Sequence, residues 1–126
     1  MYKIMIADDE GIVIDALKFI IEKSFGETCQ VQSAKTGRSV IELAESFRPD
    51  IALMDIQMPK MNGYKATQAI RNLPDKDKAC IPIVAMTANA FTEDRLKAKE
   101  AGMNDHVAKP VDMSILISVI AKYIER

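Results

Sequence analysis

The chain has 126 residues, enough for one domain that buries roughly two-thirds of its unfolded surface in a single core. Hydrophobic residues make up 48% and charged residues 28% of the chain, which excludes a disordered, collagen-like or coiled-coil protein. The net charge of -1 excludes a general attraction to nucleic acid. We therefore expect one folded domain over residues 1–126 that binds no nucleic acid directly.

The cysteines and the N-terminus indicate where the protein works. Cys29 and Cys80 stand apart, with no histidine or further cysteine at metal-binding spacing, so we expect reduced thiols in a cytoplasmic protein. Asp8, Asp9 and Glu10 interrupt the apolar N-terminal run, which excludes a signal peptide, and no later run is long enough to span a bilayer. We expect no contact between this domain and a membrane.

The first part of the chain alternates between short apolar runs and amphipathic stretches. Residues 3–7 predict a strand, and the 3.6-residue spacing of apolar side chains over 12–21 predicts a helix after it. Residues 30–34 predict a second strand and residues 39–47 a second helix, which Pro49 ends. Two strand–helix pairs are thus expected in this part.

The middle of the chain repeats this order. The apolar run at residues 51–54 predicts the third strand, and residues 62–72 predict a helix that ends near Pro74. Residues 81–86 form an apolar run that is too short for a helix, so they predict the fourth strand.

The last part completes five pairs. A helix over 92–101 is expected to end at Gly102, which takes the left-handed conformation. Leu96 is the only large apolar residue of this helix, so alanines must supply most of its packing, and we infer that the helix can move. Residues 106–108 predict the fifth strand, and the apolar spacing over 115–124 predicts the last helix.

Five alternating strands and helices predict an α/β fold, with a parallel sheet covered by helices on both faces. In such a sheet the carboxyl ends of all strands lie at one edge. Ligands bind there, at the point where the strand order reverses. The residues that follow the strands are therefore the first candidates for a functional site.

Polar side chains follow four of the five expected strands. They are Asp8, Asp9 and Glu10 after the first strand, Asp55 after the third, Thr87 after the fourth and Lys109 after the fifth. If Asp8, Asp9 and Asp55 lie about 5 Å apart, each pair repels by roughly 3 kcal/mol at an effective dielectric near 20. The carboxylates therefore need a cation, and oxygen ligands without His or Cys suit Mg²⁺.

With such an ion in place, Asp55 becomes a candidate nucleophile, because a carboxylate can take up a phosphoryl group. The Lys109 ammonium and the Thr87 hydroxyl would stabilise the charge of the transferred group. The small side chain of Ala88 would leave the phosphoryl position accessible. A cis bond before Pro110 would form a tight bend that turns Lys109 inward.

These residues lie within four longer motifs. The motifs are Ile6–Glu10, Met54–Gly63, Ala85–Ala88 and Gly102–Pro110. Through them the sequence resembles the receiver domain of two-component response regulators over its whole length. The resemblance implies a flavodoxin-like (βα)5 fold with strand order 2-1-3-4-5, which places the candidate site at the reversal point.

The resemblance also implies a role for each residue. Asp55 would accept the phosphoryl group from a histidine kinase or a histidine phosphotransfer protein. Asp9 would bind Mg²⁺ directly and Asp8 largely through water, and Asp55 and the backbone carbonyl of Gln57 would be further metal ligands. The residues expected to support the surrounding loops are Pro59, Gly63, Ala88 and Pro110.

His106 departs from the family pattern. Receiver domains have Tyr or Phe at this place, and its ring swings inward as the residue corresponding to Thr87 moves toward the phosphoryl group. We expect Thr87 and His106 at the switch positions, and the imidazole suggests a pH-sensitive switch, because histidine titrates near neutrality. From the sequence, His106 is a partly exposed strand residue with no acidic partner.

Three other functions compete with this interpretation. A phosphatase or mutase that resembles haloacid dehalogenases would have Asp-x-Asp, but the second position here is Gln57. A flavin or nucleotide site on this fold would need Gly, Ser or Thr after the first strand, where this chain has acids. A degenerate receiver that serves only as a protein-docking module is the remaining alternative.

We expect a signalling domain that catalyses only its own phosphoryl transfer and dephosphorylation. Phosphorylation would shift the population of the loosely packed helix 92–101 and the strand 106–108. These elements and the helix 115–124 would form the surface read by a downstream protein target. The domain would be either a stand-alone regulator or the C-terminal receiver of a hybrid sensor kinase.

Overall fold

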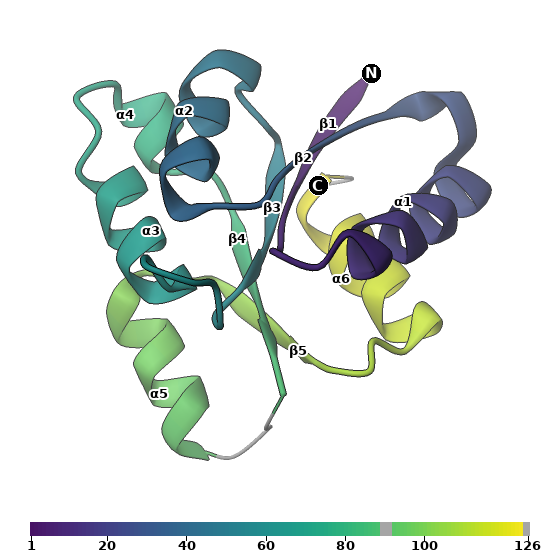
Figure 1. Cartoon of the computed structure of the whole chain (residues 1–126). Helices are drawn as coiled ribbons and strands as arrows, with labels where there is room; N and C mark the ends of the chain where they lie inside the picture. The colour runs from purple at the N-terminus through teal and green to yellow at the C-terminus, as the bar shows by residue number, and fades with distance from the viewer. Residues whose placement is uncertain (89–91, 125–126) are drawn as a thin grey trace.

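The computed structural model of the chain describes residues 1–88 and 92–124 (Figure 1). Five strands form one parallel sheet within these residues, in the order β2-β1-β3-β4-β5. The strands are β1 (Tyr2–Ala7), β2 (Cys29–Ala34), β3 (Ile51–Asp55), β4 (Ile83–Thr87) and β5 (Asp105–Ala108). The helices are α1 (Gly11–Phe25), α2 (Gly37–Phe47), α3 (Gly63–Arg71), α4 (Lys76–Ala79), α5 (Thr92–Ala101) and α6 (Met113–Ile124). The predicted α/β class and the flavodoxin-like strand order are confirmed.

Helices cover both faces of the sheet (Figure 1). Helices α2, α3 and α5 lie on one face, and α1 and α6 on the other. Successive residues of a strand point to opposite faces, so Met5 packs toward α2 and α3, whereas Ile4 and Ile6 pack toward α1 and α6. All three side chains are fully buried. No helix in the described ranges is both long and apolar enough to cross a membrane.

The register of the strands places their carboxyl ends at one edge. Ala7 pairs with Met54, so Asp8 and Asp55 follow neighbouring strands, and Thr87 pairs with Ala108, which precedes Lys109. The strand order reverses between β1 and β3, because the chain runs from β1 to β2 at one edge and then back to β3.

Two short elements were not predicted. The helix α4 and the 3₁₀ helix Gly26–Thr28 contain four and three residues, too few to show an apolar period. A local hydrogen bond defines the start of α4, where the Asp75 carboxylate accepts the Asp77 N–H at 2.9 Å.

Small residues hold α5 against the sheet. Ala98 and Ala101 are buried, as the sequence predicts, whereas Leu96 is 55% exposed and contributes little to the packing. Gly102 follows the helix with a φ of 104°, and the next N–H, of Met103, donates to the Ala98 carbonyl at 2.9 Å. The expected left-handed C-terminus of this helix is confirmed.

Arg71, the last residue of α3, fixes the C-terminal end of α5. Its guanidinium donates to the carbonyl of Gly102 at 2.7 and 2.9 Å and to the side-chain oxygen of Asn104 at 2.8 Å. It also donates to the carbonyls of Ala79 and Ile81 at 2.7 and 2.8 Å. One side chain thus joins α3, α4, the entry to β4 and the turn after α5.

Candidate functional site

Asp8 is a fully buried carboxylate at the carboxyl end of β1. Its Oδ1 accepts the N–H of Glu10 at 2.9 Å, and its Oδ2 accepts a hydrogen bond from Lys109 Nζ at 2.9 Å. Because a buried charge needs a partner, the lysine stabilises this carboxylate in place.

Asp55 ends β3 beside Asp8 and is only 4% exposed. Its Oδ1 accepts the N–H of Gln57 at 3.0 Å, and its Oδ2 lies 3.4 Å from Lys109 Nζ. Burial raises the pKa of the Asp55 carboxyl above its ordinary value, and the charge of Asp8 raises it further. The hydrogen bond from Gln57 and the charge of Lys109 lower this pKa, but they do not outweigh the increase. The carboxylate is thus desolvated and poorly neutralised.

Lys109 supplies the cation that these two carboxylates share. Its N–H donates to the Thr87 carbonyl at 2.7 Å, and its peptide bond to Pro110 is cis. Burial disfavours the charged amine, but the hydrogen bond to Asp8 and the charges of Asp55 and Asp8 outweigh this effect and raise its pKa. The side chain therefore points inward, in agreement with the bend expected from the sequence.

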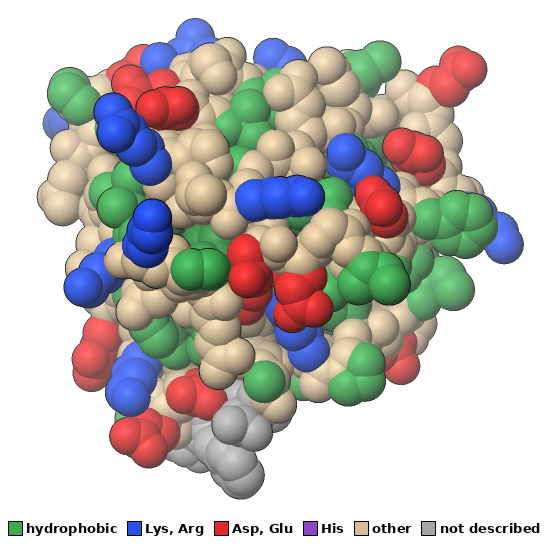
Figure 2. All heavy atoms as spheres, in the orientation of Figure 1, with side chains coloured by type: hydrophobic (Ala, Val, Ile, Leu, Met, Phe, Trp, Pro, Cys, Tyr) green, Lys and Arg blue, Asp and Glu red, His purple; other side chains and the backbone are tan. Residues whose placement is uncertain are grey.

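An acidic cluster lies next to this pair. Asp8, Asp9 and Glu10 have carboxylate oxygens within 4.8 Å of one another, and Asp9 and Glu10 are exposed. Figure 2 shows acidic side chains gathered near the middle of the face onto which β1 opens. Hard oxygen donors without nitrogen or sulfur fit a divalent cation of the Mg²⁺ type.

The cluster differs from the ligand set expected from the sequence. Glu10 belongs to it, whereas Asp55 falls outside it and is close to Lys109 and the Gln57 N–H. The side chain of Gln57 is exposed. Asp8 contacts both groups and therefore connects the cluster with Asp55.

Thr87 lies at the end of β4 and is 1% exposed. Its hydroxyl is buried and has no hydrogen-bond partner within the described part of the chain. A buried hydroxyl without a partner is uncommon, because it has lost its water without replacement. The next residue, Ala88, is exposed.

Gly63 brings the loop after Asp55 back against the strand. A Cβ atom here would lie 2.5 Å from the Asp55 carbonyl oxygen and 2.8 Å from Ile56 Cα, so no larger residue fits without movement. The Gly63 N–H donates to the Ile56 carbonyl at 3.2 Å. Earlier in this loop, the exposed Pro59 accepts the Met61 N–H at 2.7 Å through its carbonyl.

Comparison with known proteins identifies the family. The family model described as the response regulator receiver domain matches residues 4–121. The chain belongs to this family. Protein PilH of Pseudomonas aeruginosa is 33% identical to it, over 95% of this receiver chain and 95% of its own length.

Two further relatives extend the comparison. The solved receiver domain of a sensor histidine kinase from Pseudomonas aeruginosa PAO1 is 31% identical, with a TM-score of 0.86 over 99% of this chain and 98% of that one. That structure has a magnesium ion coordinated in its active site cleft. Histidine kinase 1 of Arabidopsis thaliana is 48% identical over 62% of the receiver chain, which spans only 6% of that kinase.

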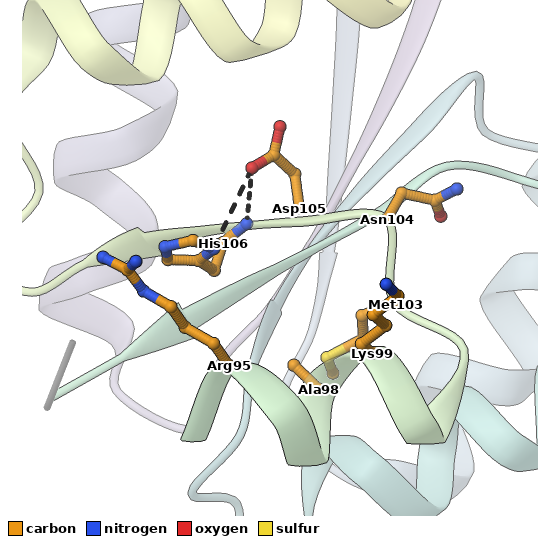
Figure 3. A pocket seen from close by; sticks show the side chains of 7 residues that line it. All are labelled: Arg95, Ala98, Lys99, Met103, Asn104, Asp105 and His106. Atoms are coloured by element: carbon orange, nitrogen blue, oxygen red, sulfur yellow. Dashed lines mark hydrogen bonds and ion pairs between the residues drawn. The ribbon is translucent and has the colours of Figure 1, made fainter. Parts of the chain in front are cut away.

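His106 of this receiver has an acidic neighbour that was not expected from the sequence. The ring atom Nδ1 lies 4.0 Å from Asp105 Oδ1, and the backbone N–H of His106 donates to the same oxygen at 2.9 Å. The prediction that it has no acidic partner is therefore wrong, although the adjacent residue in the sequence was a signal. The imidazole lies at a pocket between α5 and β5 (Figure 3).

Proposed function

We propose that this receiver domain accepts a phosphoryl group on Asp55 within a two-component phosphorelay. The observation that carries the proposal is the arrangement around Asp55: a desolvated carboxylate 3.4 Å from the Lys109 ammonium, beside an acidic cluster. Conversion to an acyl phosphate moves the negative charge from this buried carboxylate to phosphoryl oxygens, which Lys109 can neutralise.

The phosphoryl donor is a phosphohistidine of a histidine kinase or a histidine phosphotransfer protein. An Asp55 oxygen attacks phosphorus, the P–N bond breaks, and the imidazole leaves with its electron pair and takes up a proton. Lys109 neutralises charge on the transferred oxygens, and the Thr87 hydroxyl gains the hydrogen-bond acceptor that it lacks. The exposed, small Ala88 leaves room for the incoming group.

Asp8, Asp9 and Glu10 supply the carboxylates suited to Mg²⁺, with Asp55 and the Gln57 carbonyl as the further ligands proposed from the family pattern. A bound ion would supply positive charge that offsets the charge of the phosphoryl oxygens. The donor set fits it, and a receiver domain 31% identical holds magnesium in its cleft. Pro59, Gly63 and Pro110 keep the loops of the site in place.

A largely apolar groove beside the site is suited to contact with the donor protein. It has a volume of about 640 Å³ and opens between α1 and the segment after β5. Lys109 and Pro110 line it together with Ile12, which is 79% exposed. A donor that covers these side chains brings its histidine to the edge of the sheet where Asp55 lies, and it removes apolar surface from water.

Phosphorylation is read out through α5, β5 and α6. The packing of α5 through small side chains leaves it weakly held, so a modest interaction at Thr87 can shift its population. Thr87 and His106 are the proposed switch residues. Amide chemical shifts in α5 and β5 should change on phosphorylation, and unchanged shifts would reject this readout.

Acetyl phosphate with Mg²⁺ tests the reaction itself. Intact-mass measurement should detect one labile phosphoryl group, which is absent when a chelator is present from the start of the reaction and absent in Asp55→Asn. The control Asp77→Asn removes an exposed carboxylate outside the site and should be phosphorylated normally. A phosphoryl group retained in Asp55→Asn would show that another residue accepts it.

The domain is proposed to act in the cytoplasm as a signalling module that catalyses only its own phosphoryl transfer and dephosphorylation. A degenerate receiver used only for docking is not supported, because the acidic residues, Thr87 and Lys109 are all present. Residues 1–126 are proposed to form one receiver domain. Its parent is a stand-alone regulator or a hybrid sensor kinase whose C-terminal receiver it forms.

A further inference from the structure

A second hollow lies between α5 and β5 and shares no residue with the acidic cluster (Figure 3). Its volume is about 350 Å³. It is lined by Arg95, Ala98, Lys99, Met103, Asn104, Asp105 and His106. This volume is at the lower end of the range of small-ligand pockets, and it is large enough for one side chain of a partner.

Two cations stand on one side of the pocket. Arg95 and Lys99 lie four residues apart on α5, and both are exposed. Within the described ranges, neither has a carboxylate oxygen within 4.0 Å, whereas Lys97 on the same helix pairs with Glu93 at 3.8 Å. The pocket therefore presents positive charge that the fold leaves available.

The one carboxylate in the pocket already has partners. Asp105 accepts the His106 N–H at 2.9 Å, lies 3.4 Å from Lys122 Nζ, and accepts the Tyr123 hydroxyl at 3.3 Å. Its charge is therefore largely compensated from β5 and α6. It still disfavours a doubly charged phosphate more than a singly charged carboxylate.

The remaining wall of the pocket is apolar. Ala98 is 3% exposed and Met103 is 7% exposed, and both line the hollow. A glutamate side chain matches this combination, because its two methylene groups can pack on the apolar wall while its carboxylate meets the Arg95 guanidinium. Lys99, one turn further along α5, adds positive charge at the other end of the pocket. The planar guanidinium can donate two parallel hydrogen bonds to such a carboxylate.

We propose that this pocket binds a glutamate side chain from an acidic segment of the downstream partner. The proposal rests on the proposed function, because it assigns a partner chemistry to the surface that α5 and β5 present. It makes Arg95 and Lys99 the residues that select the partner. A nucleic acid would need a longer row of unpaired cations than these two.

The test is an NMR titration of the whole domain with two short blocked peptides, identical except that a central glutamate in one is glutamine in the other. The glutamate peptide should shift the amide signals of Ala98 and Met103 and bind about five- to twentyfold more tightly than its glutamine twin. Arg95→Gln should remove this difference, and the matched control Lys97→Gln should keep it.

Equal binding of the two peptides, or glutamate preference retained in Arg95→Gln, would overturn the proposal. A dimer detected by light scattering and abolished by Arg95→Gln would also overturn it, because a second copy would then occupy the pocket. The mass of the phosphoryl group on Asp55 is measured on the same samples. If Asp55 is phosphorylated normally but the glutamate peptide is not preferred, only the proposed glutamate binding is refuted. If the glutamate peptide is preferred but Asp55 is not phosphorylated, only the proposed function is refuted.

Discussion

Replacement of Lys109 by methionine tests whether this side chain holds two buried carboxylates together. Methionine has nearly the length and volume of the lysine stem, so the change removes the charge with little loss of packing. Asp8 and Asp55 then keep their negative charges in a buried site without the ammonium that lies 2.9 Å and 3.4 Å from their oxygens.

The expected cost follows from these two distances. At an effective dielectric near 20, the attraction is about 6 kcal/mol at the shorter distance and about 5 kcal/mol at the longer one. Desolvation of the three groups offsets most of this gross attraction. We therefore expect Lys109→Met to lower the free energy of unfolding by about 2–4 kcal/mol in metal-free buffer at neutral pH.

Urea unfolding followed by circular dichroism measures this difference, with and without Mg²⁺. The divalent ion should stabilise Lys109→Met more than the parent, because it provides the missing positive charge. The pKa of Lys109 is raised above its ordinary value of 10.5, so the folded state holds the proton more tightly than the unfolded chain. The stability advantage of the parent should be complete at neutral pH, where the carboxylates and the amine are all charged, and it should disappear as the pH rises above 10.5 through the raised pKa.

Lys65→Met is the matched control, because Lys65 is an exposed lysine on α3. It should change the free energy of unfolding by less than about 0.5 kcal/mol. Equal stability of Lys109→Met and the parent in chelator would refute the reasoning, since the buried carboxylates would then not depend on the ammonium.

Three further changes have defined outcomes. The pKa of Asp55 is raised, so the contribution of this carboxyl to stability should be lost as the pH rises from 3.8 through the raised pKa. In metal-free buffer, Asp55→Asn should therefore unfold at a higher urea concentration than the parent at pH 7, but not below pH 3.8. Gly63→Ala should lower the free energy of unfolding by about 2–4 kcal/mol, because its Cβ atom would clash with the backbone. The control Gly26→Ala should cost only about 1–2 kcal/mol, because Gly26 has a positive φ but open space around it. Equal shifts of the melting temperature in the two variants would contradict this prediction. Arg71→Met should lower the free energy of unfolding in urea by about 2–4 kcal/mol, because the carbonyls of Ala79 and Gly102 lose their hydrogen-bond donor. The exposed Arg38→Met is the control, and an equal effect of the two substitutions would contradict this prediction.

The strands and most of the helices could be predicted because they leave a run or a period of apolar residues in the sequence. Residues 51–54 are buried on both faces of the sheet and form a continuous apolar run, and the apolar spacing over 12–21 marks the buried side of α1. The short α4 leaves no such trace, because it has four residues and its start is defined by one local hydrogen bond, which Asp75 accepts from the Asp77 N–H.

The candidate site was predictable only as a set of strand ends. The sheet rule brings Asp8, Asp55, Thr87 and Lys109 to one edge, but it does not say which carboxylate oxygen the lysine contacts. Side-chain directions decide that Asp55 is close to Lys109 while Glu10 joins the acidic cluster. The pocket at His106 was missed for the same reason, because it depends on how α5 is placed over β5.

The hydrogen bonds of Arg71 have a mechanical consequence for α5. They anchor only the end of the helix at Gly102, while the other end lies toward the segment that follows Thr87. A helix of ten residues is about 15 Å long. Any tilt of α5 therefore pivots at the arginine, and the largest displacement occurs at its N-terminal end, which comes next in the chain after the strand that carries Thr87.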